Sequence, residues 1–344
     1  MKSTFAAGVC LALTGMLLPV ERVGAQRAIV DLGTLPGGTF SQANAINNRG
    51  DVAGFSTAAS GETHAVLWRE GAIIDLGTLP GGSFSQATSL NNRGQVVGIS
   101  STAPGPACNP GVFSVCDHAF LWDDGTMTDL GALDATFFSS GLDINDNGRI
   151  VGASSTSSGE YHAVRWDDGA ITDLGKLPGA VLTAANAVEN SGEIVGLSSD
   201  HSTTHAFVWR RGVLSPLPLV PGGDFSNAIN VNNRGDIVGQ AAIASGRLVA
   251  ARWRDGAITI LGPIPTAFSQ ANGINSRGQI VGSSTTQADV THAVLWSDDR
   301  AINLGTLPGG TDSLAYGINN RGDIVGAGNS TAGFHAILWP TVTP

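Results

Sequence analysis

The chain has 344 residues, of which 42% are hydrophobic and 13% charged, and its formal net charge is −10. A disordered chain would carry more charge and fewer aliphatic residues, so the composition indicates a folded protein. The acidic balance argues against nucleic acid and anionic membranes as partners. The 47 glycines are about twice the usual share of ~7% and indicate many tight turns between buried strands.

The N-terminal 25 residues are typical of a secretory signal peptide. Lys2 supplies the positive charge, residues 5–20 are largely apolar, and Val23-Gly24-Ala25 is a small-residue cleavage site. The apolar run is shorter than the ~20 residues that cross a membrane. We therefore expect cleavage after Ala25, a mature domain over residues 26–344, no membrane insertion, and secretion to the periplasm or the extracellular medium.

An internal repeat organises the rest of the chain. Its seven tryptophans occupy one position of the repeat and lie 54, 44, 43, 44, 43 and 43 residues apart. A period of this size is typical of propeller blades or a similar repeat array. Each period has room for four short strands, which the first copy places at 43–47, 51–56, 64–68 and 72–77. The tryptophans are Trp68, Trp122, Trp166, Trp209, Trp253, Trp296 and Trp339.

Turn chemistry separates these strand segments. Asn47-Asn48-Arg49-Gly50 follows the first, with asparagine opening the turn and glycine taking the positive-φ position. Gly54 recurs in every copy but lies inside a strand, where glycine marks a bulge or the close approach of a neighbour. We expect the recurring tryptophan to be that neighbour. Leu79-Pro80-Gly81-Gly82 then leads from the fourth segment into the next copy.

The two ends of the repeat region predict closure into a ring. The mature chain begins with a fourth-strand segment at 28–33 and ends after a third-strand segment at 335–339. If the first completes the last blade, no open sheet edge remains. The predicted fold is therefore an all-β, seven-bladed β-propeller of four-stranded blades, closed by the N-terminal strand. An open β-array is the alternative.

The repeat motifs resemble those of a known family. Asp117-His118-Ala119-Phe120-Leu121-Trp122 and His205-Ala206-Phe207-Val208-Trp209 contain a His-Ala-Phe signature, and LGTLPGG and INNRG-x-[VI]-x-G accompany it. With these motifs, the chain from about residue 29 to 339 is similar to the HAF repeat family of exported bacterial proteins. The resemblance implies an extracellular, propeller-like repeat protein, and it implies no reaction and no catalytic residues.

Six histidines form a second column, each four residues before a tryptophan. Alternate residues of a strand share a face, so His64, Val66 and Trp68 point the same way. A ring of imidazoles could bind a metal or transfer protons. However, zinc ligands lie ~2 Å from one ion, whereas packed sheets lie ~10 Å apart. We interpret the column as structural and predict no metal and no cofactor. The histidines are His64, His118, His162, His205, His292 and His335.

Motifs of known catalytic sites are incomplete. The glycine-rich segment at 76–82 lacks the lysine of a phosphate-binding loop. Residues 143–148 begin like a calcium loop, but Ser154 stands where that loop requires glutamate. We predict no catalytic residues, although carboxylates paired in space for glycoside chemistry stay possible.

An insertion in the second copy holds Cys108 and Cys116, the two cysteines of the mature chain. In an exported protein, two nearby cysteines predict a disulfide, and Phe113 between them is a candidate binding residue. We expect a monomeric, non-catalytic scaffold that binds a protein or cell-surface carbohydrate through this loop and others on the same face. The alternatives are an enzyme acting on polysaccharide or peptidoglycan fragments at the central channel, and a purely structural extracellular protein.

Overall fold

The computed structural model describes residues 28–102, 117–134, 138–200, 202–262, 268–285, 289–298 and 300–341. These ranges contain 28 β-strands, and none of their residues belongs to a helix that could cross a membrane. The predicted signal peptide and the loop holding Cys108, Phe113 and Cys116 lie outside the described residues. The predictions made for those two segments therefore stay predictions.

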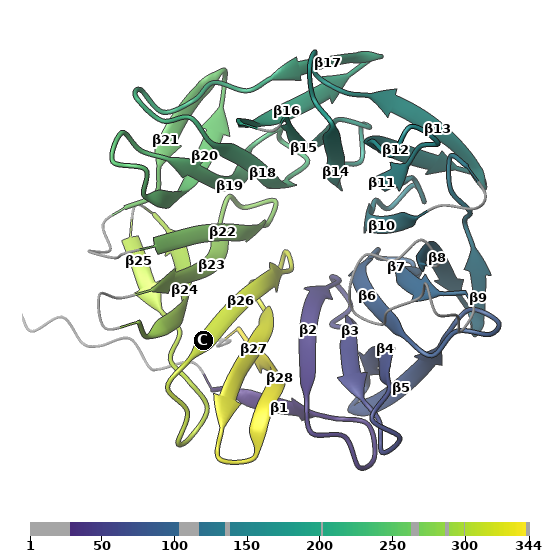
Figure 1. Ribbon diagram of the computed structural model, residues 1–344. Coiled ribbons are helices and arrows are strands. Elements are labelled where there is room, and N and C mark those ends of the chain that lie inside the picture. Colours follow the sequence, from purple (N-terminus) through teal and green to yellow (C-terminus); the bar gives the residue numbers. More distant parts are fainter. Residues whose placement is uncertain are drawn as a thin grey trace, which may run out of the picture.

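The strands form seven four-stranded antiparallel blades around a central channel (Figure 1). Blades 3 and 4 are joined into one eight-stranded sheet by a single parallel pair, Tyr161 with Leu182. In every blade the first strand is innermost. The turns between strands 1 and 2 and between strands 3 and 4 lie on one side of the ring, which we call the amide face. The other connections lie on the opposite side, the crossover face.

The strands of the first four blades follow one another in chain order. Blade 1 consists of β2 (Ser41–Ile46), β3 (Val52–Thr57), β4 (Thr63–Arg69) and β5 (Ala72–Gly77). Blade 2 consists of β6 (Ser85–Leu90), β7 (Val96–Ser101), β8 (Asp117–Asp123) and β9 (Thr126–Asp129). Blade 3 consists of β10 (Ser139–Ile144), β11 (Ile150–Ser155), β12 (Tyr161–Asp167) and β13 (Ala170–Gly175). Blade 4 consists of β14 (Leu182–Val188), β15 (Ile194–Ser199), β16 (Thr204–Arg210) and β17 (Val213–Pro216).

The last three blades end with the closure of the ring. Blade 5 consists of β18 (Ser226–Val231), β19 (Ile237–Ala242), β20 (Leu248–Arg254) and β21 (Ala257–Ile260). Blade 6 consists of β22 (Phe268–Ile274), β23 (Ile280–Thr285), β24 (Thr291–Ser297) and β25 (Arg300–Asn303). Blade 7 consists of β26 (Ser313–Ile318), β27 (Ile324–Ser330), β28 (Gly333–Trp339) and β1 (Val30–Gly33). Val30 of β1 pairs with Leu338 of β28, which confirms the predicted closure by the N-terminal strand.

The glycine inside the second strand marks a β-bulge, as the sequence predicts. The register of β2 against β3 shifts between Ala43 and Ala45, next to Gly54. A Cβ added to Gly54 would overlap the carbonyl oxygen of Gln42. The expectation that tryptophan is the close neighbour is therefore wrong: the bulged inner strand brings its own backbone against the glycine, where no side chain fits.

The tryptophans lie between blades instead. Trp68 is 5% exposed, and its indole Nε1 donates a hydrogen bond to the carbonyl of Leu32 on the outer strand of blade 7 at 2.9 Å. The indoles of blades 3, 5 and 7 make the same bond to the preceding blade. The residue before each tryptophan packs toward the next blade, as Leu67 does in one core cluster with Trp122. Each tryptophan thus links two adjacent sheets.

We predict that Gly54→Ala lowers the free energy of unfolding by about 1–3 kcal/mol, the usual range for overpacking, because the added methyl group overlaps a backbone oxygen. Gly262→Ala is the matched control, since a Cβ there meets nothing within 4 Å. Urea unfolding of both variants measures the difference. Equal effects of the two substitutions would contradict the role given to the bulge.

Candidate binding site at the channel mouth

A self-contained turn places polar side chains at one end of the channel. In blade 1 the side-chain Oδ1 of Asn47 accepts hydrogen bonds from the backbone N–H groups of Arg49, Gly50 and Asp51, each at 3.0 Å. Gly50 has a φ of 97°, which favours glycine. Asn47 is buried. One N–H of its Nδ2 donates to Asp51 Oδ2 of the same turn at 2.9 Å, and the second is left for a partner outside the turn.

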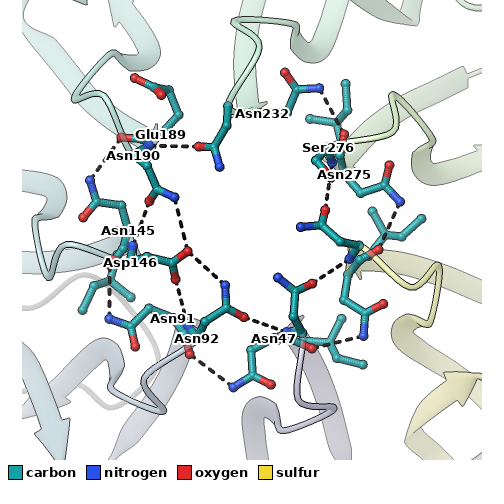
Figure 2. A pocket seen from close by; sticks show the side chains of 18 of the residues that line it. Asn47, Asn91, Asn92, Asn145, Asp146, Glu189, Asn190, Asn232, Asn275 and Ser276 are labelled. Atoms are coloured by element: carbon teal, nitrogen blue, oxygen red, sulfur yellow. Dashed lines mark hydrogen bonds between the residues drawn. The ribbon is translucent and has the colours of Figure 1, made fainter.

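That amide nitrogen bonds to the next blade and starts an inner ring of hydrogen bonds (Figure 2). We call the contact between the turns of two neighbouring blades a step. In six of the seven steps, Nδ2 of the first turn asparagine donates to the backbone carbonyl of the equivalent residue in the next blade, at 3.0–3.2 Å. The step from Glu189 to Asn232 is missing, because glutamate has no side-chain N–H. The inner ring comprises Asn47, Asn91, Asn145, Glu189, Asn232, Asn275 and Asn319.

The following residue of each turn forms an outer ring. In six of seven steps, its backbone N–H donates to the side-chain Oδ1 of the equivalent residue in the next blade, at 2.8–3.0 Å. The step from Asn233 to Ser276 is missing, because serine has no Oδ1. Both interruptions therefore flank blade 5. The outer ring comprises Asn48, Asn92, Asp146, Asn190, Asn233, Ser276 and Asn320.

Two cavities follow one another along the channel. The two rings and the aliphatic residues before them, such as Ile46 and Leu90, line a cavity of about 190 Å³ at the mouth. A second cavity of about 500 Å³ shares Ile46 and Leu90 and continues into the channel. Its wall carries Thr88, Ser89, Asp143 and Tyr316. It also carries a set of amides, which are Asn44, Asn186, Asn227, Asn230, Gln270 and Asn272.

The acidic groups of the site titrate in opposite directions. Burial alone would raise the pKa of Asp146, but hydrogen bonds from Asn92 and Asn190 and the charge of Arg93 outweigh it, so the pKa is lowered. Burial dominates at Asp143 and raises its pKa, although Ser89 Oγ donates at 2.6 Å and the Val188 N–H at 2.9 Å. The charged form is therefore favoured at Asp146 and disfavoured at Asp143.

The rings leave a few donors unused. The side-chain Nδ2 groups of Asn48, Asn233 and Asn320 have no hydrogen-bond partner within the part of the chain that the structure describes, while their Oδ1 atoms accept ring bonds. Because the ring hydrogen bond fixes Oδ1, the orientation of each side-chain amide, and with it that of Nδ2, is also fixed. The mouth can therefore offer neutral, oriented N–H donors to hydroxyl or carbonyl oxygens of a ligand.

The histidine column lies on outer strands, away from this mouth. His64 Nδ1 contacts Asp75 Oδ2 of the same blade at 2.9 Å, and His292 bonds to Asn303 at 2.9 Å. The same histidine–aspartate pair occurs at His118, His162 and His335. In blade 4, Pro216 pairs with Phe207 where blades 1, 2, 3 and 7 place this aspartate. Across the described ranges, no three His, Cys, Asp or Glu side chains gather as metal ligands would.

Sequence reasoning identified the Asn-Asn-Arg-Gly segment as a turn and overlooked its second role. The turn uses Asn47, but it does not use the side chain of Asn48. The signal available in the sequence was this second asparagine, because the turn does not need its side chain. It could not be placed at the channel without knowing that all seven turns meet on one face.

Comparison with known proteins gives the fold and no family. No family model matches the sequence, and no curated protein matches it. Among solved structures, it is similar to a Mycobacterium tuberculosis puromycin-hydrolyzing peptidase, with a TM-score of 0.55, 12% identity, and 85% of this chain and 48% of that chain covered. It is also similar to the Pyrococcus horikoshii acylaminoacyl peptidase, with a TM-score of 0.52, 11% identity, and 85% and 50% covered.

A third similar structure is a puromycin hydrolase, with a TM-score of 0.53, 13% identity, and 84% of this chain and 50% of that chain covered. This chain spans about half the length of each of the three enzymes. At such low identity the likeness shows the propeller fold alone.

We predict that Ser276→Asn closes the outer ring and raises the free energy of unfolding by about 0.5–1.5 kcal/mol, the usual net contribution of one hydrogen bond. The new Oδ1 would accept the N–H of Asn233. Ser276→Ala leaves the ring open and should have no such effect. Thermal and urea unfolding of the two variants distinguish them, and destabilisation by asparagine would argue against the ring geometry.

We also predict that Asp146→Asn changes the acid stability. Because folding lowers its pKa, the carboxylate stabilises the fold above the unfolded value of about 3.9, and this contribution is lost as the pH falls through the folded value. The stability difference between wild type and Asp146→Asn should therefore be largest near neutral pH and shrink in acid. Asp168→Asn, in an exposed turn, is the control. A pH-independent difference at Asp146 would count against this assignment.

Proposed function

We propose that this chain is an exported, non-catalytic repeat scaffold that binds carbohydrate at the channel mouth. The observation that carries the proposal is the set of unpaired amide donors on Asn48, Asn233 and Asn320, held in rings whose other polar groups bond to one another. Sugar hydroxyls accept and donate hydrogen bonds without requiring a charged partner, so neutral amides suit them.

Rigidity and size favour the same class of ligand. Each donor is oriented by a ring bond before a ligand arrives, which lowers the entropy lost on binding. The channel cavity of about 500 Å³ lies within the ~300–1,000 Å³ range of small-ligand pockets. Its wall is rich in amides, and burial raises the pKa of Asp143, which disfavours the charged form of this side chain. A neutral sugar residue fits this chemistry better than a cation.

The carboxylates at the site support a non-catalytic role, because each is held by structural bonds. Asp143 accepts hydrogen bonds from Ser89 and Val188, and Asp146 accepts them from Asn92. Glu189 takes the place of the turn asparagine and accepts the N–H groups of Ser191 and Glu193. We propose that these groups shape the mouth and do not transfer protons to a substrate.

Export and family membership are part of the same proposal. The predicted cleavage after Ala25, the predicted Cys108–Cys116 disulfide and the resemblance to HAF repeat proteins all fit a protein that works outside the cytoplasm. We propose that the mature chain is a monomer. Binding of a protein through Phe113 and the crossover-face loops is the competing mode.

A glycan array probed with the mature chain, followed by titration of the strongest glycans, tests the proposal. Asn48→Ala combined with Asn320→Ala should weaken binding about tenfold or more, because two bonds of ~0.5–1.5 kcal/mol are lost. Asn303→Asp is the control, since it lies on β25 and recreates the histidine–aspartate pair of other blades.

Unchanged glycan affinity in the double variant would refute binding at the mouth. If no glycan binds and a protein partner is captured only when the 108–116 loop is intact, the crossover-face mode replaces this one. A hydrolysed glycan would instead establish the enzyme alternative.

A further inference from the structure

A positively charged cavity lies on the amide face between blades 5 and 6. It has a volume of about 400 Å³, and five arginines and two aspartates line it, an excess of three positive charges. The whole chain has a net charge of −10, so this local excess opposes the overall balance. The arginines are Arg234, Arg252, Arg254, Arg277 and Arg300, and the aspartates are Asp236 and Asp298.

Arg252 occupies a position that five of the other six blades fill with an aliphatic residue. It precedes Trp253, as Leu67 precedes Trp68 and packs with the tryptophan of the next blade. Its Nε is buried and has no hydrogen-bond partner, and Arg252 forms no ion pair with any residue that the structure describes. Arg252 as a whole is half-buried, and burying a guanidinium nitrogen without a hydrogen-bond partner is unfavourable. Packing alone therefore does not explain an arginine at this position.

Blade 3 has an arginine at the equivalent position, and there an acidic residue lies beside it. This arginine is Arg165, and its Nε is likewise buried without a hydrogen bond. It nevertheless forms an ion pair with Asp167 Oδ2 at 3.1 Å, and its guanidinium lies over the Trp209 ring at 5.3 Å. In blade 5 the residue equivalent to Asp167 is Arg254, which pairs with Asp236 at 3.2 Å. The negative group that accompanies the arginine in blade 3 is thus replaced by a second positive one.

One tryptophan that lines the same cavity has an indole N–H without a hydrogen-bond partner. Trp296 lines the cavity and is 5% exposed, and its Nε1 has no hydrogen-bond partner. The indoles of blades 1, 3, 5 and 7 donate to a carbonyl of the preceding blade at 2.8–3.0 Å. At Trp296 this bond is not made, so a buried donor is available on the wall opposite blade 5.

Arg234 supplies a second guanidinium, which forms no ion pair among the residues that the structure describes. Other turn arginines lie against the turn glycine of the next blade: Arg321 reaches within 2.8 Å of a Cβ position on Gly50, and Arg277 within 2.9 Å of one on Gly322. Nothing lies within 4 Å of the Cβ position on Gly278, where Arg234 would be expected. Arg234 is exposed and borders the cavity instead.

We propose that this cavity binds an oxyanion, namely a phosphate, sulfate or carboxylate group carried by a small ligand. The guanidinium groups of Arg252 and Arg234 can each offer two parallel N–H donors to such a group, and the Trp296 indole adds a neutral donor. The cavity is larger than a bare ion requires, which leaves room for a sugar-sized body. The site uses other side chains than the amide donors, so it does not depend on the proposed function.

Calorimetric titration of the mature chain with inorganic phosphate, inorganic sulfate and glucuronate, at constant ionic strength in chloride, tests this site. Glucose is the neutral control. Arg252→Leu restores the residue of other blades, so it should fold with equal or higher thermal stability and weaken binding about tenfold or more, since charged hydrogen bonds contribute ~1.5–3 kcal/mol. Arg234→Gln and Trp296→Phe should weaken it by smaller factors.

The matched control is Arg165→Leu, the same change in blade 3, where Asp167 already occupies the guanidinium. It should leave anion affinity unchanged. Stronger binding of glucuronate than of inorganic phosphate identifies a sugar-borne group, and the reverse identifies free phosphate. The proposal is overturned if the wild type binds none of the three anions at millimolar concentration, or if Arg252→Leu binds them as the wild type does.

Discussion

The hydrogen bond from one turn asparagine to the next blade is the interaction on which this propeller depends. Each inner-ring asparagine accepts two or three N–H groups of its own turn at Oδ1 and donates to a neighbouring carbonyl with Nδ2. The same side chain therefore forms the turn and fixes the distance between blades. The last step runs from Asn319 to Asn47 at 3.1 Å, and the pairing of β1 with β28 holds the same junction from the outside.

Blade 5 is where this regular pattern fails, and the failures occur together. Glu189 cannot donate to Asn232, Ser276 cannot accept from Asn233, and Arg234 does not cover Gly278. On the same flank, Arg252 replaces an aliphatic residue in the space between blades. Fewer bonds join blade 5 to its neighbours on the amide face, and the positive cavity lies in the space between it and blade 6. A repeat protein can acquire a specific site in this way, by losing contacts in one copy while the other six maintain the ring.

Much of the fold was predictable from periodicity. Seven evenly spaced tryptophans indicate seven blades, and the unpaired fourth-strand segment at the N-terminus indicates closure; the structure confirms both. The bulge at Gly54 was also predictable, but its neighbour was not, because the overlapping atom is the carbonyl of Gln42 on a different strand. The candidate site was missed: Asn48 and Asn92 lie 44 residues apart and meet only when two blades stand side by side.

The sequence by itself determined the repeating unit: four strands, an asparagine-initiated turn, a glycine at each bulge and a tryptophan on each third strand. These features depend on neighbours within one copy, so a single copy is enough to reveal them. Only the tertiary structure decided what lies between copies: which amides bond across blades, which remain free, and where Arg252 and Trp296 are left without partners. The reason is that the closed ring sets the contacts between blades. The effect of a residue that differs in one copy therefore depends on which residues of the next blade it contacts.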